Sequence, residues 1–164
     1  MLYLVDASSL ITAHNTYLAL HRVPEFWDWL LHHGGTGGVK MPKVIYEEVE
    51  DGNDALADWM GEQATKDALL FDEAAVPAHV LTAMACYGPN PTEADLITMG
   101  KDPFLVAAAL VDTNDRRVVT AEVSKPGRIG PRRHLPNVCT DCGVGWMTLV
   151  QLMTALDFTT GWKG

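Results

Sequence analysis

The chain has 164 residues, of which 48% are hydrophobic and 20% charged, so it has the material for one globular core and does not have the composition of a disordered chain. No apolar run approaches the ~20 residues of a membrane helix, and no signal peptide opens the chain, so we expect a cytoplasmic protein with no membrane partner. The formal charge of −9 disfavours general binding to nucleic acid. The three cysteines, Cys86, Cys139 and Cys142, are too few for a disulfide framework.

The chain opens with a short apolar strand that stops at an acidic residue. Leu2 to Val5 is an unbroken apolar run, typical of a strand buried on both faces, and Asp6 follows directly. Ligands of open α/β sheets bind beyond the carboxyl ends of the strands, so Asp6 lies where chemistry is expected. The alternative is that Asp6 or Ser8 only caps the helix predicted over 8–17.

The next elements contain a second unusual acid. A helix over 24–33 carries aromatic side chains that we assign to the core, and a short strand over 39–41 precedes a helix over 42–51. On this helix Glu48 shares a face with apolar side chains three and four residues away. A carboxylate directed at an apolar face is unfavourable unless it is paired, protonated or bound to a metal, which favours Glu48 over its neighbour Glu47 as a functional residue.

The middle of the chain is predicted to be mostly helical, and several of its helices begin with recognisable capping residues. Helices are predicted over 54–66 and 75–87, and Thr92 with Asp95 fits a capping box that opens another. Asp102 stands before a proline at the start of the following helix, an arrangement typical of an N-cap acid. Taken alone, Asp102 is therefore a cap.

A second strand followed by an acid comes late in the chain. The strand is predicted over 117–120, and Glu122 lies just past its end. Residues 124–136 are rich in glycine, proline and arginine and predict a loop, before a short strand over 137–140 and a helix over 145–157. Because strands and helices alternate with no repeat or linker, we expect one α/β domain with a mainly parallel sheet.

The charges are unevenly distributed along the sequence. From Val44 to Asp102 there are 13 acidic residues and two basic ones, whereas Arg116 to His134 holds six of the 12 lysines and arginines. This basic span indicates either a solvated loop or a surface for phosphates. Four acids stand out by their positions: Asp6, Glu48, Asp102 and Glu122. Carboxylates are hard oxygen ligands that suit Mg²⁺ or Mn²⁺, and these ions activate water for attack on a phosphodiester.

Four segments in order resemble the PIN-domain nucleases, within them the small single-domain branch that includes VapC-like toxins. The opening acid motif is LVDASSLI over 4–11, and the helical glutamate lies in VIYEEV over 44–49. The third motif is DPFLVAAA over 102–109, and the fourth is VVTAE over 118–122. The helical segment FWDWL over 26–30 and the segment PNVC over 136–139 further resemble an uncharacterised single-domain branch of that superfamily.

The resemblance implies a Rossmann-like three-layer α/β/α sandwich, PIN-like over all of 1–164, and a metal-dependent endoribonuclease acting on RNA with Mg²⁺ or Mn²⁺. It implies that Asp6, Glu48, Asp102 and Glu122 hold the metal and its water and that Ser8 makes a hydrogen bond within the site. VapC-like relatives also imply an antitoxin protein and a homodimer as partners. The loop after Glu122 is a candidate RNA-binding segment through its basic side chains: Lys125, Arg128, Arg132 and Arg133.

Two departures from the family pattern leave other interpretations open. The first motif has Ala7-Ser8 where many members have Thr-Asn, and the last has Ala121-Glu122 where Asn-Asp is common. A catalytically impaired module that acts as an RNA- or protein-binding scaffold is therefore the main alternative. A phosphatase using Asp6 as nucleophile lacks a second aspartate at position 8 for its general acid.

The cysteines raise one more alternative. Cys139 and Cys142 form a single CxxC, to which His134 is a candidate third zinc ligand, but an ordinary thiol pair is the simpler interpretation because no second CxxC completes a four-ligand site.

Overall fold

Five short strands form one parallel sheet in the order β3-β2-β1-β4-β5. The computed structural model describes residues 1–164. The strands alternate with helices, as the sequence predicts, and β1 lies at the centre of the sheet. The five strands are β1 (Leu2–Val5), β2 (Val39–Pro42), β3 (Leu70–Phe71), β4 (Arg116–Val119) and β5 (Gly145–Met147). In this register Leu4 pairs with Lys40 of β2 and Val118 of β4, so both neighbours of β1 run in its direction. The mainly parallel sheet expected from the sequence is confirmed.

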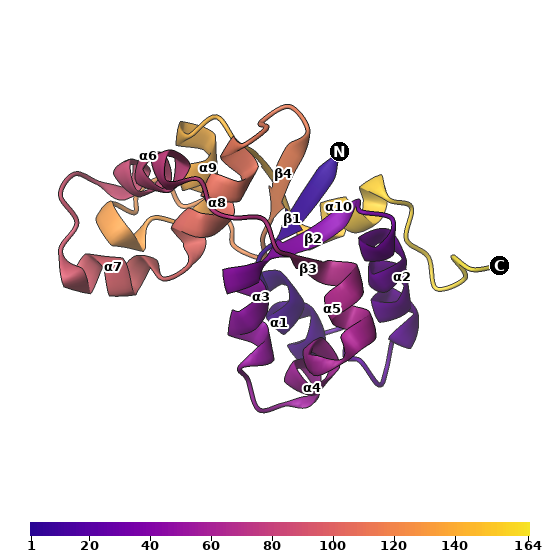
Figure 1. Ribbon diagram of the computed structural model, residues 1–164. Coiled ribbons are helices and arrows are strands. Elements are labelled where there is room, and N and C mark those ends of the chain that lie inside the picture. Colours follow the sequence, from indigo (N-terminus) through magenta and orange to yellow (C-terminus); the bar gives the residue numbers. More distant parts are fainter.

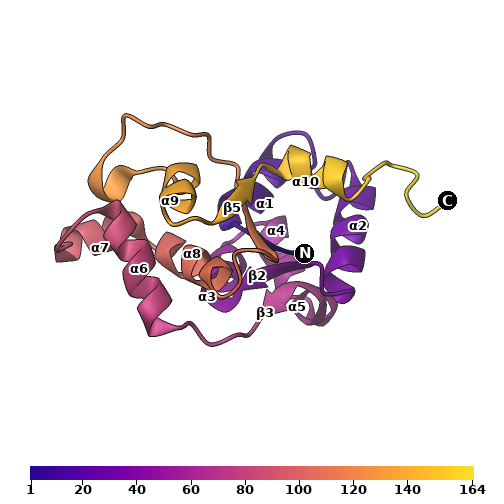
Figure 2. The same ribbon diagram turned by 90° about the horizontal axis from the view of Figure 1, so that it is seen from above.

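Helices cover both faces of the sheet and give a Rossmann-like three-layer sandwich. Helices α6 to α9 lie together on one side, and α1 to α5 lie on the other (Figures 1 and 2). The helices are α1 (Ala7–Asn15), α2 (Pro24–Gly35), α3 (Lys43–Glu50), α4 (Ala55–Gly61), α5 (Gln63–Leu69), α6 (Pro77–Tyr87), α7 (Glu93–Met99), α8 (Asp102–Leu110), α9 (Leu135–Asp141) and α10 (Leu149–Ala155), with a 3₁₀ turn η1 (Gly130–Arg132). None of these helices has the length and apolar character that spanning a membrane requires.

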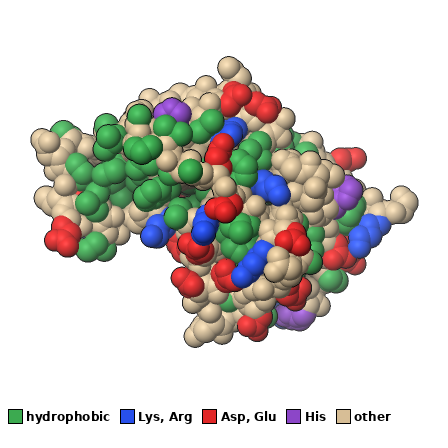
Figure 3. Space-filling model, in the orientation of Figure 1, with side chains coloured by type: hydrophobic (Ala, Val, Ile, Leu, Met, Phe, Trp, Pro, Cys, Tyr) green, Lys and Arg blue, Asp and Glu red, His purple; other side chains and the backbone are tan.

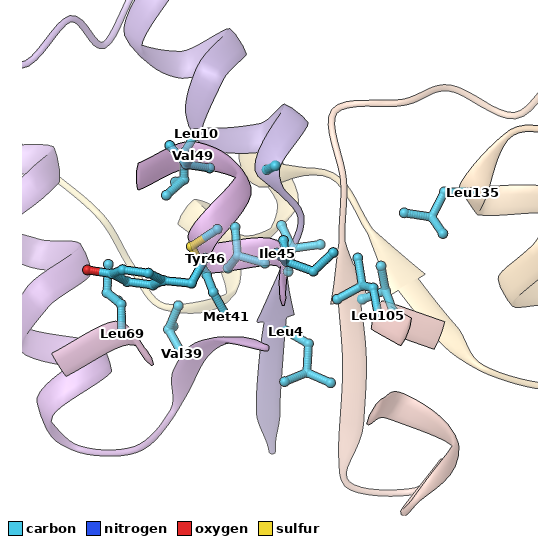
Figure 4. Packing of buried hydrophobic residues seen from close by; sticks show 14 of the residues in the cluster. Leu4, Leu10, Val39, Met41, Ile45, Tyr46, Val49, Leu69, Leu105 and Leu135 are labelled. Atoms are coloured by element: carbon cyan, nitrogen blue, oxygen red, sulfur yellow. The ribbon is translucent and has the colours of Figure 1, made fainter. Parts of the chain in front are cut away.

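The core is built where the strands meet these helices. Leu4 of β1, Ile45 of α3 and Leu105 of α8 are fully buried and lie close to the sheet (Figure 4). Removing this apolar surface from water drives the layers together, at about 25 cal/mol for each Å² buried. Phe26, Trp27 and Trp29 of α2 are also buried, which confirms the assignment of these aromatic side chains to the core.

The predicted elements of the last third are shifted in the structure. The predicted strand over 137–140 is wrong, because these residues belong to α9, where Pro136 occupies the first turn without needing a hydrogen-bond donor. The last strand is β5, inside the range assigned to the final helix. That helix, α10, begins only at Leu149, after a capping box formed by Thr148 and Gln151.

The middle of the chain also differs in detail. The single helix predicted over 54–66 is two helices, α4 and α5, separated by the extended backbone of Glu62. The short edge strand β3 follows them and was not expected. The capping box of Thr92 and Asp95 at the start of α7 is confirmed by reciprocal side-chain-to-backbone hydrogen bonds.

Candidate functional site

Asp6 lies at the end of β1 and is only 6% exposed. It occupies the N-cap position of α1, but its side chain makes no capping hydrogen bond. Instead, one of its oxygens, Oδ2, accepts hydrogen bonds from the hydroxyl of Ser8 and, at 3.2 Å, from that of Thr120. Burial raises the pKa of Asp6, the two hydroxyls act in the opposite direction, and the charge of Glu122 raises the pKa further. The capping alternative for Asp6 therefore does not describe this side chain.

Thr120 is the site residue that sequence reasoning missed, because it was assigned to the predicted strand over 117–120 as its last residue. It is fully buried directly after β4, beside the end of β1. Its Oγ1 donates to Asp6 and accepts the backbone N–H of Glu122 at 3.1 Å, so it links the two strand ends. A polar residue following one of two adjacent parallel strands is the signal that would have found it.

Asp102 opens α8 instead of capping it. The N-cap residue is Lys101, and Asp102 makes no capping hydrogen bond, so the prediction of a simple cap is wrong. Its Oδ2 accepts a hydrogen bond at 3.4 Å from the hydroxyl of Tyr87, a buried residue at the end of α6. Burial raises the pKa of Asp102 to about 7, with further contributions from the negative charges of Asp6, Glu122 and Glu48.

Glu48 reaches the same region from α3. Ile45 and Val49 are buried as predicted, but Glu48 is exposed at the edge of their apolar face and does not point into it. It lines a polar cavity together with Lys101 and Glu47. Partial removal of solvent raises the pKa of Glu48, the charge of Asp6 raises it further, and Lys101 lowers it. Glu48 is therefore coupled electrostatically to Asp6.

Glu122 follows β4 and connects the site to α9. Its Oε2 accepts the backbone N–H of Leu135 at 2.7 Å and lies 3.7 Å from Nδ1 of His134. The N–H groups of a first helical turn have no partner within the helix, so Glu122 satisfies one of them. One oxygen of Glu122 therefore has a structural role, and the carboxylate also contributes negative charge to Asp6 and Asp102.

The four predicted acids therefore interact electrostatically at the carboxyl-end edge of the sheet. Among His, Cys, Asp and Glu side chains, no group of three is arranged to hold a metal ion directly. The donor chemistry nevertheless fits a hard divalent cation, because the carboxylates disfavour one another's ionised forms and an added positive charge relieves this. Mg²⁺ usually keeps several of its waters, so it suits carboxylates that reach it partly through water.

The basic loop after Glu122 contains three exposed basic side chains and one that makes hydrogen bonds within the fold. Lys125, Arg128 and Arg132 are exposed. Arg133 is held within the fold, where it donates to the backbone carbonyl of Cys86 and to Asp141 at 2.6 Å. The loop thus leaves three of its four candidate RNA-binding residues facing solvent.

The cysteines form no metal site with their neighbours. Cys86, Cys139 and Cys142 are free thiols, and no group of three His, Cys, Asp or Glu residues is arranged to bind a metal. Burial raises the pKa of Cys142 to about 12, and a hydrogen bond with Cys86 adds to the effect. Burial raises the pKa of Cys139 as well, so the thiols of Cys139 and Cys142 are protonated at neutral pH.

Together these features define an α/β protein with a parallel sheet and a group of acidic side chains at the carboxyl ends of its strands. The chain belongs to the family described as Domain of unknown function (DUF4411), whose model matches residues 3–160. The matched range contains all four acids. A comparison with curated proteins found no match.

Proposed function

We propose that the protein is a metal-dependent endoribonuclease that hydrolyses RNA phosphodiester bonds. The observation that supports this most directly is the convergence of Asp6, Glu48, Asp102 and Glu122, from four separate elements, on one edge of the sheet. Neither Asp6 nor Asp102 acts as a helix cap, so capping does not account for these two acids. Besides burial, the charges of neighbouring acids in this set raise the pKa of Asp6, Glu48 and Asp102, so the four carboxylates lie near one another, and a group of neighbouring carboxylates attracts a cation.

Asp6, Glu48 and Asp102 would hold a Mg²⁺ or Mn²⁺ ion, with Glu122 acting through water. When bound, such an ion polarises a phosphoryl oxygen and lowers the pKa of a coordinated water. The chain's own residues fix the carboxylates. The hydroxyls of Ser8 and Thr120 orient Asp6, and the hydroxyl of Tyr87 orients Asp102.

Partners follow from the same proposal. Lys125, Arg128 and Arg132 supply phosphate contacts next to the acidic edge. The resemblance to VapC-like toxins extends the proposal to a toxin that an antitoxin neutralises and that forms a homodimer. A hydrophobic face around α6 (Figure 3), where Leu81 is exposed, supports a protein partner.

The test is cleavage of a pool of structured RNAs by the purified protein with Mg²⁺, Mn²⁺ or EDTA, beside the Asp6→Asn and Asp102→Asn variants. Asparagine keeps the shape of aspartate and removes its charge. We expect metal-dependent cleavage that both variants lose. Equal cleavage by the wild type and the variants would identify a contaminating nuclease and contradict the proposal.

Two observations favour a second candidate function, a catalytically impaired module that binds RNA or protein. No three acidic side chains are arranged as direct metal ligands, and an oxygen of Glu122 is engaged by α9. This candidate predicts RNA or protein binding without cleavage in either metal. Calorimetric titration with Mn²⁺ separates the two, since a scaffold has no need of a metal bound by Asp6 and Asp102.

A further inference from the structure

An uncharged groove lies between α1 and α10 and opens beside the acidic edge. Its cavity volume is about 350 Å³, within the range of ligand-binding pockets. Leu149, Val150 and Met153 of α10 form its apolar wall, facing hydroxyl-bearing residues of α1. No Lys, Arg, Asp or Glu lines it, and Figure 2 shows the two helices that enclose it.

Part of the groove adjoins residues of the candidate site. Ser9 and Ala121 line its inner end, and they are the immediate neighbours of Ser8 and Glu122. The backbone N–H of Ala121 donates to the hydroxyl of Ser8 at 3.4 Å. A phosphate held at the acidic edge therefore has the mouth of the groove next to it.

The exposed aromatic residue at the groove indicates the kind of occupant. Tyr17 lines the groove and is 90% exposed, although a tyrosine ring carries a large apolar surface. An exposed ring beside an apolar wall is the arrangement on which unpaired nucleobases stack. Paired bases have both faces and their hydrogen-bonding edges occupied, so a base must be unpaired to enter.

The charge of the molecule favours the same occupant. A chain with a formal charge of −9 gains little from RNA phosphates outside the loop of Lys125, Arg128 and Arg132, so contacts that do not depend on phosphate are needed as well. An uncharged groove with a stacking residue provides such contacts. A peptide segment is less well matched, because only the α1 side of the groove offers hydroxyl partners to its backbone N–H and C=O groups, and the wall of Leu149, Val150 and Met153 offers none.

We propose that this groove binds one unpaired nucleobase of RNA, stacked on Tyr17 and packed against Val150, adjacent to the phosphate at the acidic edge. The inference deepens the nuclease proposal and rests on it for the position of the phosphate. It assigns the substrate class as RNA with a single-stranded nucleotide beside the cleaved bond.

The experiment measures quenching of 2-aminopurine fluorescence in EDTA, with two probes. One probe is 2-aminopurine riboside, which has no phosphate, and the other is a single-stranded RNA with one 2-aminopurine. Tyr17→Ala and Val150→Asp should each raise the dissociation constant roughly tenfold or more, the scale of one stacked base. Tyr17→Phe keeps the ring and should bind like the wild type.

A matched control separates the groove from the general surface. Ile97 on α7 is 76% exposed and Val150 is 70% exposed, so Ile97→Asp adds the same charge to an equally exposed apolar helix position away from the groove. We expect Ile97→Asp to leave quenching unchanged. A loss as large as that of Val150→Asp would mean that charge alone acts, and it would overturn the proposal.

The outcomes distinguish this proposal from the nuclease proposal. Equal affinity of Tyr17→Ala and wild type, together with metal-dependent cleavage, overturns the base site and leaves the nuclease standing. Riboside binding that Tyr17→Ala loses, without any cleavage, supports the groove while the nuclease fails. Quenching of neither probe by the wild type overturns the base site and favours a protein segment as occupant.

Discussion

Asp6 is a buried carboxylate that the fold holds in place with two hydroxyl groups. Desolvation of the charge disfavours folding, and the hydrogen bonds from Ser8 and Thr120 offset only part of that cost. A residue that weakens the fold and lies at a strand end is expected to be kept for function. Stability and activity should therefore respond in opposite directions when its charge is removed.

We predict that Asp6→Asn stabilises the protein by about 1 kcal/mol in EDTA at neutral pH, because the amide oxygen still accepts hydrogen bonds and no charge is buried. The same change should reduce cleavage by more than the ~10–100-fold that losing an outer hydrogen-bonding partner of a metal site causes. Thermal unfolding and cleavage rates measure the two effects. Asp95→Asn is the control: its pKa is lowered by the capping box, so it should lose stability and keep cleavage. Destabilisation by Asp6→Asn would contradict the prediction.

The pKa of Asp102, raised to about 7, predicts a pH dependence of stability in metal-free buffer. Between the ordinary pKa near 3.8 and the raised value, the folded protein binds more protons at this position than the unfolded chain does. Stability therefore falls as pH rises through this interval and levels off above pH 7. Melting temperatures from pH 4.5 to 8 in EDTA should show this fall for the wild type, and less of it for Asp102→Asn. Added Mg²⁺ should reverse the fall. Parallel curves for the two proteins would show that Asp102 is not the titrating group.

At this scale the sequence indicates which acids are unusual, but not how they are held. Asp6 and Glu122 could be selected because each follows an apolar run. Thr120 was recognisable only as a polar residue at a strand end, because its hydrogen bond to Asp6 crosses from one strand to another. Tyr87 could not be selected, because it meets Asp102 only through the packing of α6 against α8. The orientation of Glu48 was predicted wrongly because three- and four-residue spacing defines a helix face but not where burial ends on it.

Among the elements, α9 is the one that depends on a site residue. Its first turn donates the N–H of Leu135 to Glu122, so replacing this side chain changes a helix start as well as the acidic edge. We predict that Glu122→Ala costs about 1 kcal/mol of stability, the typical value for losing a cap. Glu122→Gln keeps an oxygen acceptor and should lose much less. Urea unfolding of both variants tests this, and equal losses would show that the contact with Leu135 has no energetic weight.

The same helix shows why some elements cannot be predicted from sequence. Residues 137–140 include a valine, a cysteine and a threonine, all compatible with a strand, and only the proline at position 136 favours a helix start. The edge strand β3 has two residues, too few for any alternating pattern, and exists because it pairs with Met41 and Pro42 of β2. By contrast, β1 was predictable because a strand at the centre of a parallel sheet is apolar throughout.

Over the whole molecule, the excess of negative charge makes the position of each free cation important. Arg128 and Arg132 are exposed on the loop that follows Glu122, whereas Arg133 is paired with Asp141 and the Cys86 carbonyl. On this loop Lys125, Arg128 and Arg132 are free to replace counterions on RNA, and Arg133 is not. Arg133→Ala is accordingly expected to lower stability and leave the salt dependence of binding unchanged.

We predict that the double variant Arg128→Ala/Arg132→Ala binds single-stranded RNA more weakly and lowers the slope of log K against log salt concentration by about 1.4, or 0.7 for each phosphate contact removed. The double variant Arg22→Ala/Lys163→Ala removes the same charge elsewhere and serves as the control. Fluorescence anisotropy in EDTA at four salt concentrations gives both slopes. If net charge alone governed binding, the two double variants would lose the same affinity. A larger change in slope for the loop variant is expected because only that loop follows directly from the acidic edge.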